Sequence, residues 1–174
     1  MESVEKYLKS WASNIVRQQR GILKKRGKNA TGKLSRSLKY QLSNYSDGYI
    51  LEFFMAPYGK FIDKGVRGKL VQRTYIDVTG KRKRTPYKFK SKQPPTRVFD
   101  KWLIKRGIAP RDKGGKFMSR NSLKFLIARS VYKKGIQATS FFSKPFALGF
   151  KNFTTGLLDA VEVYFNNNID EINN

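Results

Sequence analysis

Apolar residues recur at steps of three and four near the beginning of the chain. The series is Val4, Leu8, Trp11, Ile15 and Ile22. This spacing places one apolar stripe on an α-helix. Ser3 can cap the start, and the cations that precede Gly27 suit the negative end of the helix dipole. We therefore predict an amphipathic helix over about residues 3–28.

Two segments with strand character follow this helix. Residues 37–42 alternate apolar and polar side chains, residues 49–56 are strongly apolar, and the segment between them is rich in turn-forming residues. This arrangement predicts an antiparallel hairpin. Pro57 interrupts the second strand, and residues 58–64 can form a short helix that ends at Gly65, where a positive φ is easily adopted.

The middle of the chain predicts a second, strongly basic hairpin. Residues 74–78 and 85–89 have strand character, and Thr79-Gly80 lies between them. Four consecutive cations follow this dipeptide: Lys81, Arg82, Lys83 and Arg84. We predict that the four cations form the tip of the hairpin. A helix is expected from Phe99 to Gly107, after an extended linker, and a basic loop rich in glycine covers residues 108–115.

The last third of the chain predicts two helices separated by an irregular segment. Ser119 or Asn121 can cap a helix that runs to Lys134 and stops at Gly135. Its expected inward residues are Leu123, Leu126, Ile127, Val131 and Tyr132. Residues 140–150 are aromatic and are expected to be irregular, whereas residues 152–169 have the spacing of an amphipathic helix.

These elements predict an α+β fold in which a small antiparallel sheet is packed by N-terminal and C-terminal helices. A chain of 174 residues has the size of one domain, 1–174. Residues 66–118, with the basic hairpin and one helical segment, are expected to be an insertion in that domain. Residues 170–174 are expected to be a polar tail.

The net charge of the chain indicates a polyanionic partner. Lys and Arg number 37 against 12 Asp and Glu, which gives a net charge of +25. Residues 6–46 contain eleven bases and no acid, whereas residues 152–174 contain four acids and no base. Such an excess of positive charge repels itself and favours nucleic acid as a partner. A charged surface that only keeps the protein in solution is the simpler alternative.

Composition argues against an enzyme. The chain has no histidine and no cysteine, which excludes His-based dyads and the usual zinc ligands. Ser35 and Ser37 lie near lysines in a chain where lysines are everywhere, so we interpret these serines as structural. The acids in the body of the chain do not have the spacing of a metal-dependent nuclease: Asp47, Glu52, Asp63, Asp77, Asp100 and Asp112. We expect no catalysis, cofactor or metal.

Membrane association is not expected either. No signal peptide is evident, and the longest apolar run is four residues, 53–56, whereas a membrane-spanning helix needs about 20. We expect a soluble protein made in the cytoplasm.

Three separated strings add a family resemblance. They are TGKLSRSL at residues 31–38, APYGKFIDKG at 56–65 and ARSVYKKGI at 128–136, and the last is followed by FFSKPF at 141–146. In this order they resemble the neck and tail-completion (head–tail connector) proteins of tailed bacteriophages, in the long form carried by crAss-like phages of gut bacteria. The positions that carry the resemblance, and that it marks as candidates for subunit contact, are Gly32, Leu34, Ser37, Tyr58, Phe61, Asp63, Gly65, Arg129, Gly135, Pro145 and Phe146.

The resemblance implies a structural protein of the virion that is made in the host cytoplasm. Copies of such a protein join into a ring of 12-fold or 6-fold symmetry between portal and tail, against portal, adaptor or other tail proteins. The ring would line or support the channel for double-stranded genomic DNA and contact that DNA without sequence preference. The main alternative is a stand-alone basic nucleic-acid-binding protein.

The four cations at residues 81–84 are the expected DNA contacts. Lys and Arg side chains at a hairpin tip would bind phosphates and release counterions without reading the bases. A solvated tip, or a contact with an acidic neighbouring subunit, would produce the same pattern of residues.

Overall fold

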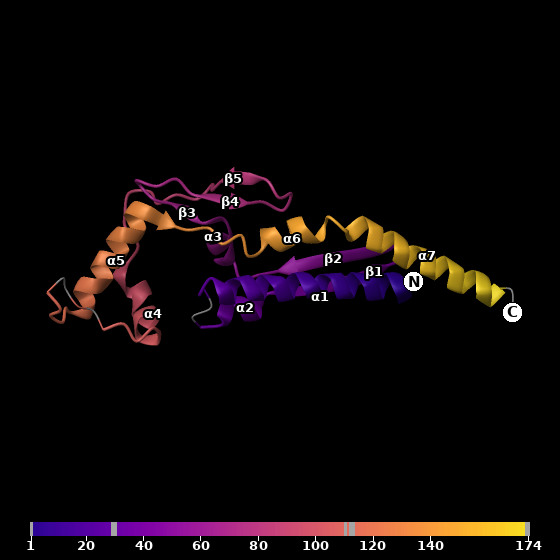
Figure 1. The fold of residues 1–174 in the computed structure, drawn as a ribbon, viewed down its shortest axis with the longest axis horizontal. Helices are drawn as coiled ribbons and strands as arrows, with labels where there is room; N and C mark the ends of the chain where they lie inside the picture. Colours follow the sequence, from indigo (N-terminus) through magenta and orange to yellow (C-terminus); the bar gives the residue numbers. More distant parts are fainter. Residues whose placement is uncertain (1, 29–30, 110, 112–113, 173–174) are drawn as a thin grey trace. The chain divides into compact units, whose positions relative to one another are not determined.

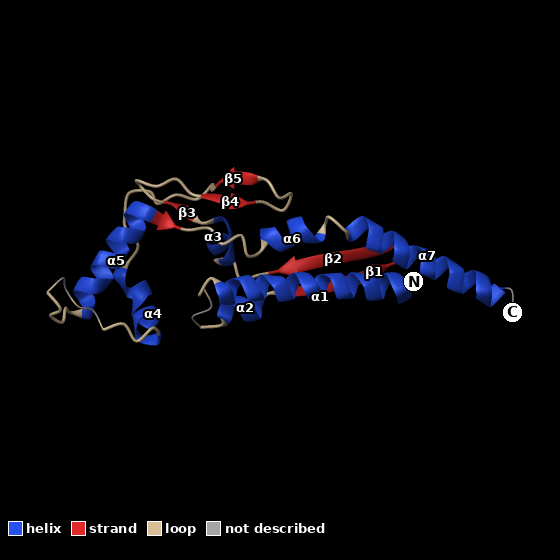
Figure 2. Cartoon of the chain, viewed as in Figure 1, coloured by secondary structure: helices blue, strands red, loops and turns tan. Residues whose placement is uncertain are grey.

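The computed structural model describes residues 2–28, 31–109, 111 and 114–172, and it confirms the expected α+β fold (Figures 1 and 2). The α-helices are α1 (Glu2–Lys25), α2 (Lys33–Ser37), α3 (Gly59–Lys64), α4 (Asp100–Lys105), α5 (Arg120–Lys134), α6 (Ser143–Gly149) and α7 (Phe153–Ile172), and a 3-10 helix, η1, covers Thr96–Phe99. The strands are β1 (Lys39–Tyr45), β2 (Gly48–Phe54), β3 (Val66–Arg67), β4 (Thr74–Ile76), β5 (Arg82–Arg84) and β6 (Gly135–Ile136).

The chain folds into two compact units. Unit 1 contains residues 1–59, 76–81 and 140–174, and unit 2 contains residues 60–75 and 82–139. The expected insertion, 66–118, lies in unit 2 except for 76–81. These six residues belong to unit 1, where the Ile76 amide donates to the Ser140 hydroxyl at 2.9 Å and the Ser143 hydroxyl donates to the Ile76 carbonyl.

The core of unit 1 forms along α1, where α6 and α7 pack (Figure 1). Leu8 and Ile15 of the expected stripe are buried, whereas Trp11 and Ile22 are half-buried and their neighbours Ala12 and Leu23 are fully buried in their place. Three side chains of α1 also donate hydrogen bonds to carbonyls of the other two helices: Ser3 to Ala160 at 2.8 Å, Tyr7 to Phe153 at 2.9 Å and Trp11 to Gly149 at 3.3 Å. Burial and the nearby Asp159 carboxylate raise the pKa of Tyr7 above its ordinary value.

The first hairpin is confirmed and covers part of the same core. β1 and β2 pair antiparallel from Lys39↔Phe54 to Tyr45↔Gly48, so the turn has two residues. Phe53 on β2 packs edge-on against Phe146 of α6, with ring centroids 4.8 Å apart, and against Trp11 of α1 at 6.0 Å.

The start of this hairpin differs from the expectation. Ser37 does not begin the strand but ends α2, where its hydroxyl donates to the Leu34 carbonyl at 2.8 Å and accepts from the Ala56 amide at 3.0 Å. Gly32 has a φ of 71° and precedes α2, so the chain enters a helical turn where the sequence pattern favours a loop. Leu34 and Leu38 are both buried as a result.

Unit 2 contains a short antiparallel pair and helix α5. β3 and β6 pair through Val66↔Ile136 and Arg67↔Gly135. Of the two candidate caps, Ser119 is the residue that begins α5, since its hydroxyl accepts from the Ser122 amide at 3.1 Å. The expected inward side of α5 is partly wrong, because Leu126 is 48% exposed whereas the shorter Ala128 is fully buried.

Two further expectations need correction. Residues 140–150 are not irregular, since residues 143–149 form α6. Pro145 is compatible with this helix because it lies in the first turn, where an amide hydrogen has no partner within the helix. The second hairpin exists, but its second strand is β5 at 82–84 and not 85–89.

Whether the chain unfolds as one domain can be tested with its two tryptophans. Trp11 lies in unit 1 and Trp102 in unit 2, so W102F and W11F each leave one fluorescent reporter. Neither unit is one continuous stretch of chain, so the segments of each unit are joined in sequence through the other. We therefore expect fluorescence and circular dichroism to give coincident denaturant transitions in both variants. Two separated transitions would contradict the single cooperative domain.

Candidate nucleic-acid interface

The four consecutive cations lie mostly along a strand. The turn that precedes them is organised by Asp77, whose Oδ1 accepts from the Thr79 amide at 2.9 Å, the Thr79 hydroxyl at 2.7 Å and the Lys81 amide at 2.9 Å. Lys81 therefore ends the turn, and the next three cations form β5, so the tip expected from the sequence consists of residues 77–81. The preference of a buried carboxylate for several donors explains this placement.

This geometry divides the cations between two faces. Arg82 and Arg84 alternate with Lys83 along β5, and neighbouring side chains of a strand point to opposite sides. All three residues are exposed. They are accessible to a polyanion, but one flat ligand cannot meet all of them together.

A groove in unit 2 collects cations more densely, and we call it the Lys88 groove. It has a volume of about 410 Å³ and is lined by Arg67, Gly68, Lys69, Lys88, Phe89, Lys90 and Ser91. Four of these seven residues are cations and none is an acid. In the part of the chain that the structure describes, no ion pair neutralises any of the four.

Backbone pairing fixes the position of the groove. The Arg67 amide donates to the Tyr87 carbonyl at 2.8 Å, and the Phe89 amide donates to the Arg67 carbonyl at 3.2 Å. Arg67 thereby forms a parallel bridge with Lys88. Lys88 and Lys90 are both exposed, whereas Tyr87 and Phe89 are half-buried, so this segment alternates as a strand edge does.

Tyr132 of α5 supports one side of the groove. Its hydroxyl donates to the Ser91 carbonyl at 3.1 Å, and its ring lies 6.2 Å from that of Phe89. The Lys69 ammonium lies 5.9 Å from the centre of the Tyr132 ring. The segment that carries Lys88 and Lys90 is thus held at both ends. Several fixed cations without acids form a surface that suits the phosphate backbone of a nucleic acid.

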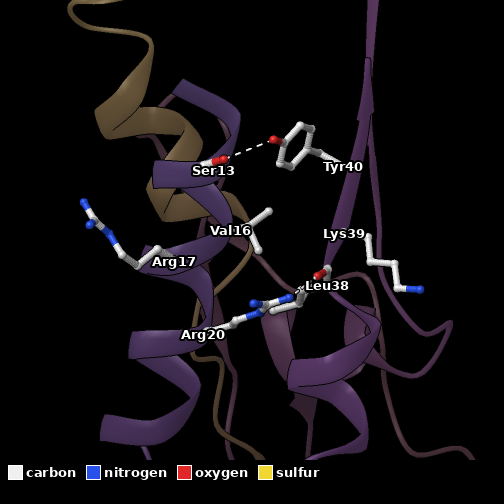
Figure 3. A pocket seen from close by; sticks show the side chains of 7 residues that line it. All are labelled: Ser13, Val16, Arg17, Arg20, Leu38, Lys39 and Tyr40. Atoms are coloured by element: carbon white, nitrogen blue, oxygen red, sulfur yellow. Dashed lines mark hydrogen bonds between the residues drawn. The ribbon is translucent and has the colours of Figure 1, made fainter. Parts of the chain in front are cut away.

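A second groove, in unit 1, is less suited to phosphate. It has a volume of about 540 Å³ and is lined by Ser13, Val16, Arg17, Arg20, Leu38, Lys39 and Tyr40 (Figure 3). Its central guanidinium is already engaged: Nη2 of Arg20 donates to the Leu38 carbonyl at 2.8 Å and Nε to the Ser35 carbonyl at 3.2 Å. Arg20 therefore connects α1 to the start of β1, a structural role.

The residues behind the family resemblance divide between the two units. Gly32, Leu34, Ser37, Tyr58, Pro145 and Phe146 belong to unit 1, and Phe61, Asp63, Gly65, Arg129 and Gly135 belong to unit 2. In unit 2 the second and third strings are brought together, since a Cβ atom built on Gly65 would lie 2.7 Å from the Ile136 carbonyl oxygen. Five of these residues are buried and build the fold: Leu34, Asp63, Gly65, Pro145 and Phe146. Tyr58, Phe61 and Arg129 are exposed, so they remain candidates for subunit contact.

Sequence reasoning missed the residues of the Lys88 groove. Its two sides come from residues 67–69 and 88–91, which are separated by about twenty positions. The alternation of Lys88 and Lys90 with Tyr87 and Phe89 was a usable local signal, but the neighbouring run at 81–84 has the higher charge density. Which strand edge lies beside Arg67 depends on long-range pairing that no local pattern encodes.

The described residues hold no group of three or more His, Cys, Asp or Glu side chains that could bind a metal ion. Among them, no helix is long and apolar enough to span a bilayer.

Comparison with known proteins adds no assignment. No family model, curated protein or solved structure matches the chain.

Proposed function

We propose that the protein is a structural subunit of a ring in the neck or tail of a tailed bacteriophage. The ring would lie between portal and tail in the virion and support the DNA channel. The Lys88 groove carries this proposal, because it is lined by four cations that form no ion pair with any described residue, and such cations offer phosphate contacts without any means of reading bases. The ordered strings at residues 31–38, 56–65 and 128–136 supply the link to the neck proteins.

Exposed apolar side chains favour an assembling protein over a stand-alone nucleic-acid-binding protein. Leu158, Phe165 and Ile169 on α7 are each more than half exposed. A monomer that binds DNA by charge has no use for such a surface, whereas a subunit of an oligomer does. The partners of the proposed ring are further copies of the chain, the portal or adaptor, other tail proteins and double-stranded DNA.

Imaging of the purified protein tests the ring. We expect closed rings with 6-fold or 12-fold symmetry in electron micrographs, together with a matching mass by native mass spectrometry. A protein that stays monomeric at all concentrations, with and without DNA, while binding DNA in a salt-dependent way would support the stand-alone alternative.

Matched charge removal tests which surface contacts DNA. The double variant K88Q/K90Q removes two cations from the Lys88 groove, and R82Q/K83Q removes two from β5. If each groove lysine contacts one phosphate, the log–log salt slope of the first variant falls by about 1.8, which weakens binding roughly 60-fold near 0.1 M salt. We expect a smaller loss for R82Q/K83Q, since its two side chains point to opposite faces.

Fluorescence anisotropy with two unrelated duplexes of equal length measures these affinities. Both duplexes should lose affinity equally, because phosphate contacts carry no sequence information. A larger loss for R82Q/K83Q would assign the contact to residues 81–84, and equal affinities of all variants would remove DNA from the proposed function.

A further inference from the structure

The outer face of α7 combines apolar and acidic side chains. Leu158, Glu162, Phe165 and Ile169 follow one another at steps of four, three and four, which places them on one stripe of the helix. Leu158 is 63% exposed, Phe165 58% and Ile169 52%, and Glu162 is also exposed. Asp159 adds a second exposed acid beside the stripe. We call this surface the α7 stripe.

This face is separate from the one that holds α7 in unit 1. The inner face contacts α1 through the Tyr7 bond to the Phe153 carbonyl and the Ser3 bond to the Ala160 carbonyl. Ala160 is two residues from both Leu158 and Glu162, about 200° around the helix. The α7 stripe is therefore free to bind a partner while unit 1 stays intact.

The charge of the stripe restricts that partner. DNA is excluded because acids would face its phosphates. Two stripes against each other would bring Glu162 and Asp159 of both chains together, and like charges at an interface cost free energy. The stripe therefore fits a surface that is apolar and basic.

Helix α5 offers such a surface on every copy of the chain. Phe125 and Leu126 are 49% and 48% exposed. Arg129 is also exposed and lies four residues after Phe125 and three after Leu126, so it shares their side of the helix. Lys133 lies four residues further, one turn along the same side. Over the described residues, neither Arg129 nor Lys133 forms an ion pair. The two helices thus carry complementary patterns of apolar and charged side chains.

We propose that the α7 stripe of one copy binds the outer face of α5 on the next copy, with Glu162 paired to the basic side chains around Arg129. The two surfaces differ, so the contact is head-to-tail and can be repeated from copy to copy. This inference rests on the part of the proposed function in which copies of the chain join into a ring.

Charge reversal followed by mixing tests the pairing. E162K and R129E each place like charges across the contact, and we expect each to weaken self-association at least about tenfold, the effect of losing one interfacial charge pair. An equimolar mixture of the two variants should regain association, because the reversed α7 of one chain then meets the reversed α5 of the other. Analytical ultracentrifugation over a concentration series gives these values.

Two control variants match the change in charge at other exposed positions. D47K, in the turn between β1 and β2, makes the same change of charge as E162K. K101E, on α4, makes the same change of charge as R129E. Both should self-associate like the wild type, within about twofold. Circular dichroism of all variants should be unchanged, since every substituted side chain is exposed.

Several outcomes would overturn the proposal. These are a wild type that is monomeric at all concentrations, single reversals that behave like their controls, and weakened single variants whose mixture does not recover. In the last two cases, self-association of the wild-type protein would still support the proposed ring. Equal DNA affinities of all variants in the anisotropy experiment, together with recovery of self-association on mixing, would support the head-to-tail contact and remove DNA from the proposed function.

Discussion

The substitution G135A is expected to lower the free energy of unfolding by about 3 kcal/mol or more. Gly135 has a φ of 76°, a conformation in which an alanine is strained. A Cβ atom at this position would also lie 2.2 Å from the Val66 carbonyl oxygen and 2.5 Å from the Gly68 amide nitrogen. These are backbone atoms of the β3–β6 pairing and its continuation, so relief requires the strands to separate.

G107A is the matched control, because it places an alanine at a positive φ but brings its Cβ atom into no close contact. Gly107 has a φ of 60°, and a Cβ built there meets no atom within 4 Å. We expect a loss of about 1 kcal/mol for this variant. Urea denaturation with a constant m value measures both. Equal losses would show that the close approach of Gly135 to β3 does not limit stability.

Gly135 also illustrates what a sequence pattern can predict. The end of a helix at a glycine follows from local chemistry, and α5 ends there as expected. That the same glycine pairs with Arg67 could not be predicted, because the pairing joins segments about seventy residues apart. Local rules predict where an element ends, whereas partners at long range depend on the fold.

The difference between local patterns and long-range pairing also explains which other elements could be predicted. The apolar spacing of α1 and the turn residues of the first hairpin predicted both elements, since each pattern repeats over many residues. Helix α2 was missed because five residues are too few to show a period. Helix α6 was missed because aromatic residues at 141–150 suggested irregular structure, although Phe146 and Phe150 are stacked one turn apart.

The candidate site was the least predictable part. The cation run at 81–84 was the strongest charge signal in the sequence, and most of it forms strand β5. The turn before it depends on Asp77, an acid that we had assigned no structural role. The Lys88 groove needs Arg67 and Lys88 to lie side by side, which is a property of the bridge between them. Positive charge is visible in a sequence, but its convergence on one surface is not.

The second large effect is expected for W11A, which should lower the free energy of unfolding by about 3 kcal/mol. The Trp11 indole lies 4.8 Å from the Phe153 ring, 5.4 Å from Phe150, 6.0 Å from Phe53 and 6.1 Å from Phe146. It therefore joins α1 to β2, α6 and α7. Removing it leaves a cavity between these elements, and large-to-small changes of aromatic residues in cores typically cost 3–5 kcal/mol. The lower figure applies because Trp11 is partly exposed.

Two further variants separate the contributions to this loss. W11F keeps an aromatic ring but removes the hydrogen bond to the Gly149 carbonyl, and we expect a cost of about 1 kcal/mol. W102A removes the other tryptophan, which is 36% exposed and has Arg106 at 5.9 Å from its ring, and we expect about 1 kcal/mol here as well. Thermal and urea unfolding followed by circular dichroism compare all three. If W11A costs no more than W102A, the aromatic cluster around α1 is not the main source of stability in unit 1.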